Sequence, residues 1–206
     1  MYCTECECEY NGWKGKCPVC KTRLISPQPA QDRPSLEAKK YQDLLQAVQN
    51  NGGKICVKLT TIEFGRNRTW SFPYFGYGYG WTRLMAGEFD RLQISLRSSQ
   101  VVKTKTIRFP YRGYGFSWTK TFHGEIAGVP ITLEATEVAR KKKYGFPYFG
   151  YGYAWTDRMA GTCGEDLSLT FTTTKTRRMN RRSFPYKGHG YAWIKEADLT
   201  IEYLET

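Results

Sequence analysis

Apolar and polar residues alternate along five stretches of the chain, which begin at Ile55, Leu92, Ile131, Leu167 and Leu199. Because successive side chains of an extended strand point to opposite faces, a period of two predicts a β-strand with one buried face. A polar segment follows such a strand, for example residues 97–100, and we expect a turn there before a Thr- and Lys-rich return strand. The pattern therefore predicts a mainly β protein.

A ten-residue phrase rich in aromatic residues and glycine occurs four times. It reads FPYFGYGYGW, FPYRGYGFSW, FPYFGYGYAW and FPYKGHGYAW, and it begins at Phe72, Phe109, Phe146 and Phe184, in steps of 37, 37 and 38 residues. A fixed period of this size indicates four copies of one supersecondary unit. If the strands run antiparallel in chain order, all four phrases lie at the same end of the sheet.

The simplest fold for these repeats is an antiparallel meander of eight strands, closed as a barrel or as a two-sheet sandwich. Residues 199–204 would pair with residues 55–59, which removes the free edge of the sheet. A four-bladed propeller is the alternative.

Before the repeats, the sequence predicts a helix that begins after Ser35 and ends at the Asn-Asn-Gly-Gly segment 50–53. Its apolar residues lie near one face: Leu36, Tyr41, Leu44, Leu45 and Val48. We expect this helix to plug or flank the sheet.

Four cysteines near the start of the chain have the spacing of a metal site. Cys3, Cys6, Cys17 and Cys20 form C-x2-C-x10-C-x2-C, so two pairs of thiolates can close tetrahedrally on one ion. Zinc is the expected ion, and iron of the rubredoxin type is the alternative, because a four-thiolate cage suits both. Cys8 is a spare thiol between the pairs and a conceivable alternative ligand.

The segment YCTECECEYNGWKGKCPVC resembles the N-terminal zinc ribbon of the bacterial recombination-repair ATPases of the RadA/Sms family. The resemblance covers about the first 20 residues and includes the approach to the second cysteine pair, Trp13-x-Gly15-Lys16-Cys17. The ATPase core of that family needs a Walker A loop, which the sequence lacks. The resemblance therefore implies metal ligation by the four cysteines and nothing more.

These elements divide the chain into three parts. Residues 1–25 form the zinc ribbon, residues 26–53 form a proline-rich linker and the amphipathic helix, and residues 54–206 form the β domain of four repeats. No apolar run approaches the roughly 20 residues of a membrane helix, and we expect no membrane partner. The chain opens on cysteines rather than on a signal peptide, so we expect a cytoplasmic protein.

The positive charge of the chain lies in the repeats. The net charge is +12; residues 1–53 hold 7 basic and 6 acidic side chains, against 24 and 13 in the repeats, an excess of +11. Such a field favours polyanionic partners. Cations precede every copy of the aromatic phrase: Arg66 and Arg68; Lys103, Lys105 and Arg108; Arg140, Lys141, Lys142 and Lys143; Arg177, Arg178, Arg181 and Arg182. Their alternative role is a solvated strand face or protection of a sheet edge.

The aromatic phrases suggest rings presented beside these cations. Glycine on either side leaves space in front of a ring, so Tyr77, Tyr114 and Tyr151, with His189 in the fourth copy, are candidate stacking platforms for bases or sugars. The alternative is that these rings pack as small cores, since large aromatic side chains serve burial first.

The sequence favours a binding protein over an enzyme. Only two histidines occur, one of which replaces a tyrosine of the other copies, and no nucleophile elbow, zinc-protease helix or phosphate loop is present. Cys56 and Cys163 are expected to be buried small side chains. The favoured function is binding of DNA or RNA with low sequence specificity. The alternative is a structural subunit of a large assembly, as in a virion, with aromatic interfaces and possible homo-oligomers. Glycan binding is a weaker third reading.

Overall fold

The computed structural model describes residues 2–3, 8–9, 16, 21, 36–71, 75–108, 112–145, 149–183 and 187–204. They form two compact units, residues 1–38 and 39–206. In the first unit, strands β1 (Tyr2–Cys3) and β2 (Cys8–Glu9) pair antiparallel, with Cys3 opposite Cys8. Of the four predicted metal ligands, Cys6, Cys17 and Cys20 lie outside the described residues.

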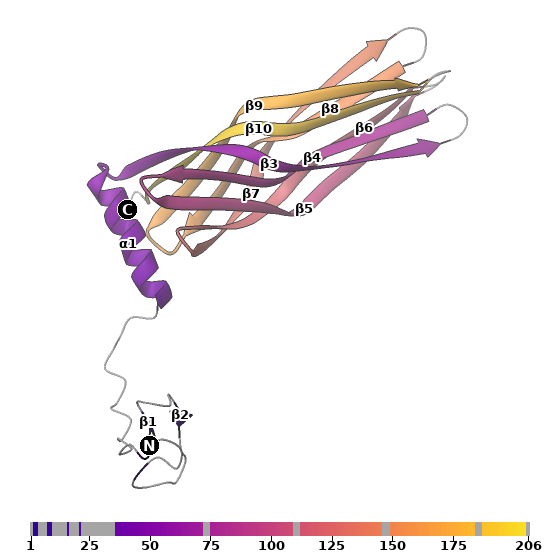
Figure 1. Ribbon diagram of the computed structural model, residues 1–206. Helices are drawn as coiled ribbons and strands as arrows, with labels where there is room; N and C mark the ends of the chain where they lie inside the picture. Colours follow the sequence, from indigo (N-terminus) through magenta and orange to yellow (C-terminus); the bar gives the residue numbers. More distant parts are fainter. Residues whose placement is uncertain are drawn as a thin grey trace. The chain divides into compact units, whose positions relative to one another are not determined.

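The second unit is an eight-stranded antiparallel barrel with one helix, α1 (Leu36–Asn50) (Figure 1). The strands follow one another around the barrel in chain order, and β10 closes it by pairing with β3. The strands are β3 (Lys54–Ser71), β4 (Phe75–Phe89), β5 (Leu92–Arg108), β6 (Arg112–Ile126), β7 (Val129–Gly145), β8 (Phe149–Cys163), β9 (Leu167–Ser183) and β10 (Lys187–Tyr203).

The predicted meander is confirmed, and so is its closure. Leu199 lies opposite Val57 and Ile201 opposite Ile55. The predicted turn at residues 97–100 is wrong, because β5 runs through this segment without a break. The chain turns instead at pairs such as Asp90–Arg91 and Ala127–Gly128, whose residues all have positive φ, as hairpin turns that match the strand twist require.

The polar segment at residues 97–100 marks a bulge rather than a turn. The pairing of β5 with β6 shifts register on both sides of Gln100, leaving Ser99 and Lys120 without partners in the ladder. The same double shift occurs in the β3–β4, β7–β8 and β9–β10 pairs, at spacings of 37, 37 and 38 residues. Bulges bend strands and increase their twist, so each long hairpin changes direction at the same level.

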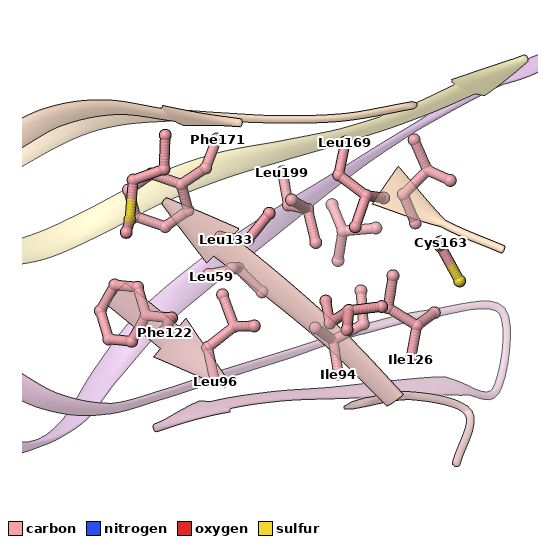
Figure 2. Close-up of a cluster of buried hydrophobic side chains, with 14 of the residues drawn as sticks. Leu59, Ile94, Leu96, Phe122, Ile126, Leu133, Cys163, Leu169, Phe171 and Leu199 are labelled. Atoms are coloured by element: carbon pink, nitrogen blue, oxygen red, sulfur yellow. The ribbon is translucent and has the colours of Figure 1, made fainter. Parts of the chain in front are cut away.

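Below the bulges, all eight strands pair and the barrel interior is filled by aliphatic side chains. Leu59, Leu96, Leu133, Leu169 and Leu199 are at most 1% exposed, and Figure 2 shows them pointing into one cluster with Phe122 and Phe171. The five leucines are residues that the period of two places on the buried face of their strands. An eight-stranded barrel is just wide enough for side chains to fill.

Helix α1 lies across the end of the barrel near the short turns (Figure 1). Leu44 and Val48 are fully buried in the same core as the barrel leucines, and Tyr41 Oη donates to the carbonyl oxygen of Cys163 at 3.2 Å. The predicted plug is therefore confirmed. Leu36, which the helical pattern had placed on the apolar face, is 70% exposed at the first turn.

Above the bulges, the barrel divides into four two-stranded hairpins. The pairing of β4 with β5 covers only residues 84–89 of β4, and the β6–β7, β8–β9 and β10–β3 pairs end at the same level. The pairs joined by the aromatic phrases continue to the strand ends. We call these segments the distal hairpins and number them first to fourth: residues 64–82, 101–119, 138–156 and 176–194.

A layer of threonines links the distal hairpins where they separate. Thr119 Oγ1 donates to the carbonyl oxygen of Thr82 at 3.0 Å, and Thr156 Oγ1 donates to the carbonyl oxygen of Thr119. The fourth copy has Ile194 at this position, and its backbone carbonyl accepts from Thr82 Oγ1 at 3.3 Å. The hydroxyls satisfy carbonyl groups of the neighbouring hairpin where no strand pairs with them.

Each distal hairpin has an inner strand (β4, β6, β8 or β10) and an outer strand (β3, β5, β7 or β9), and the inner strands touch backbone to backbone. A Cβ built on Gly152 would lie 2.7 Å from the carbonyl oxygen of Gly115, and one built on Gly115 would lie 2.9 Å from that of Gly78. Gly78 and Gly190 make the same contact with the preceding hairpin, both at 2.7 Å. Only glycine permits this approach, which explains one of the repeated glycines of each aromatic phrase.

The repeated tyrosines fill the space beside another repeated glycine. The rings of Tyr77, Tyr114 and Tyr151 lie over Gly113, Gly150 and Gly188 of the next hairpin, and the smaller His189 lies over Gly76 and completes the circle. All four side chains are 1% exposed. The expectation that Tyr77, Tyr114, Tyr151 and His189 present accessible rings is therefore wrong. They are the core that the alternative interpretation described, since in-register glycines let neighbouring hairpins close over them.

Candidate functional site

The distal hairpins contain all of the excess positive charge of the chain. Their 76 residues include 15 of the 31 Lys and Arg residues and no Asp or Glu, so the rest of the chain holds 16 basic and 19 acidic side chains. The first to fourth hairpins carry two, four, four and five cations. A surface of one sign attracts anions with no internal carboxylate to compete for them.

The ion pairs of the described residues follow the same division. All seven use cations outside the distal hairpins, such as Arg83 with Glu63 at 2.7 Å and Lys54 with Glu202 at 2.8 Å. The side chain of Arg108 lies outside the described residues. The other predicted cations of the hairpins are exposed on the outer strands: Arg66, Arg68, Arg140, Lys141, Lys142, Lys143, Arg177, Arg178, Arg181 and Arg182.

Neighbouring hairpins contact each other through cations laid on tryptophan rings. Lys103 Nζ lies 4.4 Å from the ring centre of Trp81, and the Arg140 guanidinium lies 4.8 Å from that of Trp118. Arg178 covers Trp155 at the same distance. Each cation comes from the outer strand of one hairpin, and each ring from the inner strand of the preceding hairpin. Such contacts hold the cation near the wall of the groove between the two hairpins.

The groove between the fourth and first hairpins is built differently. Here Phe64 stacks on Trp193, with ring centres 4.2 Å apart and planes inclined by 3°. Arg66 occupies the position in its copy that Lys103 and Arg140 occupy in theirs. With the tryptophan face taken by Phe64, Arg66 lines an open groove of about 490 Å³. The full lining is Arg66, Asn67, Arg68, Met179, Asn180, Arg181 and Tyr191.

Alternation along the strands shows which side chains face this groove. Arg66, Arg68 and Trp70 share one face of β3 with Phe64, and the ring of Trp70 meets His189 edge-on at 4.5 Å. On the opposite wall, Arg181 lies two residues after Met179 on the same face of β9, and Arg177 lies two residues before it. Arg66 and Arg68 therefore line one wall and Arg181 lines the other, with Arg177 on the same face of β9 outside the lining.

The sequence analysis missed the aromatic side chains that stand beside cations at the surface. Trp70 is 41% exposed and Tyr144 is 51% exposed. Each follows two cations at alternate positions of an outer strand, as Arg66-x-Arg68-x-Trp70 and Arg140-x-Lys142-x-Tyr144. This spacing was the available signal, because it places all three side chains on one strand face.

Three buried tyrosines of the distal hairpins are held in the neutral phenol form. Burial raises the pKa of the Tyr77, Tyr79 and Tyr153 hydroxyls above the ordinary value for tyrosine. Tyr151 Oη accepts a hydrogen bond from Arg182 Nε at 3.1 Å. These phenols lie within the protein and offer no acid or base to an external substrate.

The remaining candidates for chemistry lie in the part of the barrel below the bulges, which we call the proximal barrel. Cys163 is fully buried, as expected, and burial raises its pKa to about 11; Cys56 is exposed, against expectation, because it lies on the outer face of β3. Within the described ranges, no group of three or more metal-binding side chains occurs. The only helix described in residues 36–204, α1, lacks the length and apolar character needed to cross a membrane.

Comparisons with protein-family models, curated proteins and solved structures find no match for this chain. The fold and the charged surface therefore define the molecule only as a closed β-barrel with four cationic hairpins.

Proposed function

We propose that this protein is a non-enzymatic nucleic-acid-binding protein that uses the cationic faces of its distal hairpins. The observation that carries the proposal is the segregation of charge: 15 cations and no carboxylate in four hairpins that share one end of the barrel. A polyphosphate backbone is the polyanion that such an extended surface can contact at many points. Contacts to phosphate carry no sequence information, so binding of DNA or RNA has low sequence specificity.

The N-terminal segment adds a metal site in this proposal. Cys3, Cys6, Cys17 and Cys20 bind one zinc ion, with iron as the less favoured ion, and the ribbon docks nucleic acid or a protein partner. The pairing of β1 with β2 brings the backbone of Cys8 directly opposite Cys3, one of the four proposed ligands. Four thiolates fill the coordination sphere, so the metal has a structural role. Paired thiols of this kind favour a reducing compartment such as the cytoplasm.

The alternative function is a subunit of a large assembly. Of the described rings of the aromatic phrases, Tyr77, Tyr114, Tyr151 and His189 are buried within one chain, so these four cannot form interfaces with neighbours. The outer strands of the distal hairpins do have free edges and exposed apolar side chains, such as Ile107 at 51% exposure and Met179 at 43%. Free edges can pair with another copy, although the lysines and arginines along them oppose that pairing.

Binding to fluorescent oligonucleotides tests the proposal. We expect a monomer by light scattering, and an affinity that falls by orders of magnitude between 50 and 200 mM salt if about 6–10 phosphates are contacted. The variant Arg140→Gln/Lys142→Gln removes two hairpin cations and should weaken binding. The matched control, Arg97→Gln/Arg158→Gln, removes two exposed cations of the proximal barrel and should leave affinity within about twofold, because these two face Glu63 and Glu137. Salt-independent binding, no binding, or a large oligomer indifferent to oligonucleotides contradicts the proposal.

A further inference from the structure

We infer that the groove between β3 and β9 is the main binding site for a single-stranded nucleic-acid backbone, with an unpaired base stacked on Trp70. The inference rests on the proposed function and deepens it, because it assigns the binding to one groove of the four. It also selects single strands over duplexes.

The lining of this groove has the chemistry of a phosphate site. Arg66 and Arg68 on one wall face Arg181 on the other. Guanidinium groups bind phosphate oxygens through two parallel hydrogen bonds. No acidic residue occurs in either hairpin that forms the walls. The groove has a volume of about 490 Å³ between the two walls.

The other three grooves differ because their equivalent cations already have partners. Lys103, Arg140 and Arg178 lie on tryptophan rings, at 4.4 to 4.8 Å from the ring centres. A phosphate that bound there would have to draw the cation from its ring or share it. Arg66 is spared this contact because Phe64 covers Trp193. Because Phe64 rather than a cation covers Trp193, the guanidinium of Arg66 is available to a ligand in the groove between β3 and β9.

The groove also differs from its neighbours because its cations are all arginines. By strand alternation, Arg66, Arg68, Arg177 and Arg181 face it, whereas Lys103 and Lys105 face the groove between the first and second hairpins. Arginine presents a planar fork of donors where lysine presents a point charge, so an all-arginine groove fixes a phosphate in a defined orientation. This favours one ordered path for the backbone over diffuse attraction.

Trp70 determines the choice of single-stranded ligand. Its ring is 41% exposed, lies on the same strand face as Arg66 and Arg68, and has the Arg68 guanidinium 5.9 Å from its centre. Aromatic rings beside a cationic groove stack on unpaired bases, and each stack stabilises the complex by about 1–3 kcal/mol whatever the base. A duplex keeps its bases stacked inside and offers no unpaired base to stack on Trp70.

The experiment compares two charge-matched variants of the full chain. Arg66→Gln/Arg181→Gln removes one arginine from each wall of the groove, and Lys103→Gln/Arg140→Gln removes two cations that lie on tryptophans. Affinity for a fluorescent 12-nucleotide oligo(dT) is measured by anisotropy from 50 to 400 mM salt. Loss of two phosphate contacts should make the negative slope of log K against log salt less steep by about 1.4. This change corresponds to about 25-fold weaker binding at 100 mM salt.

We expect this loss for Arg66→Gln/Arg181→Gln and less than about fivefold for Lys103→Gln/Arg140→Gln. Equal losses for the two variants would overturn the groove assignment and leave the proposed function standing. Absence of salt-dependent binding by the unmodified protein would overturn the proposed function as well.

Trp70→Leu tests the stacking step separately. We expect about 5- to 150-fold weaker binding of oligo(dT) with no change in the salt slope, since no charge is removed. A duplex of the same length should bind the unmodified protein more weakly and should not respond to this substitution. An unchanged oligo(dT) affinity, or tighter binding of the duplex, would overturn the single-strand assignment. If a variant melts more than a few degrees below the unmodified protein, photo-crosslinking of oligo(dT) to the unmodified protein decides instead: adducts in residues 66–70 support the inference, and adducts confined to the other three grooves refute it.

Discussion

Substitution of Gly152 by alanine should destabilise the protein, although alanine normally stabilises a strand relative to glycine. The added Cβ would lie 2.7 Å from the Gly115 carbonyl oxygen and 3.0 Å from the Phe116 ring. Backbone cannot rotate away as a flexible side chain can, so the third and second hairpins must separate. Overpacking of this kind costs about 1–3 kcal/mol, while the reduced entropy of the unfolded chain returns about 0.4–1 kcal/mol.

The net loss is about 1–2 kcal/mol, which for a chain of this size lowers the melting temperature by about 2–8 °C. Gly80→Ala is the matched control, since the other three copies carry Ser117, Ala154 and Ala192 at this position. Its Cβ would lie 3.1 Å from its nearest neighbours, and we expect a melting temperature within about 2 °C of the unmodified protein. Thermal unfolding by circular dichroism measures both. A Gly152→Ala variant that melts at or above the temperature of the unmodified protein would refute the close-packing explanation of the repeated glycines.

Three further predictions concern the buried phenols, the thiols and the metal. Tyr77 Oη is buried without a hydrogen-bond partner among the described residues, so Tyr77→Phe should leave stability unchanged or raise it by about 1 kcal/mol in denaturant titrations. Tyr151→Phe loses the hydrogen bond from Arg182 Nε and should lower stability by about 0.5–1.5 kcal/mol. The opposite order of the two variants would contradict the assignment. With its pKa raised to about 11, Cys163 is only about one-thousandth thiolate at pH 8, so iodoacetamide followed by peptide mapping should label exposed Cys56 and spare Cys163 until the barrel unfolds. Elemental analysis should find one zinc per chain, retained in Cys8→Ser and lost in Cys6→Ser, and chelation should leave the melting of residues 39–206 unchanged because they form a separate compact unit.

The proximal barrel could be predicted from the sequence because its two faces differ. Inward leucines and isoleucines alternate with outward polar residues, and this contrast is what a period of two reports. The helix followed for the same reason, since Leu44 and Val48 are buried in the core whereas Gln42, Asp43 and Gln46 are exposed. The turn at residues 97–100 was mispredicted because a run of polar residues has the same appearance at a bulge on an exposed surface as at a reversal of the chain.

The distal hairpins could not be read in this way because their inner strands are buried on both faces. Tyr77 and Gly78 point to opposite sides of β4, yet both are in contact with a neighbouring hairpin. The two contacts join residues 36 and 112 positions apart in sequence, Tyr77 with Gly113 and Gly78 with Gly190, so no local pattern reports them. The candidate cations, by contrast, were foreseen because a charged side chain without a carboxylate nearby remains at the surface wherever the strand lies.

The groove between β3 and β9 can be told apart from the other three because the four copies of the repeat are similar but not identical. The three cation-covered tryptophans show what the common unit does, and Phe64 on Trp193 is a departure from it that no single copy would reveal. The buried His189, which replaces the tyrosine of the other copies, meets the ring of Trp70 edge-on. Two of the positions at which the copies differ, Phe64 and His189, therefore contact tryptophans of the hairpins that form this groove, Trp193 and Trp70. Four equivalent grooves would predict several weak and interchangeable sites, whereas these two differences predict one site with its own salt dependence and its own preference for unpaired bases.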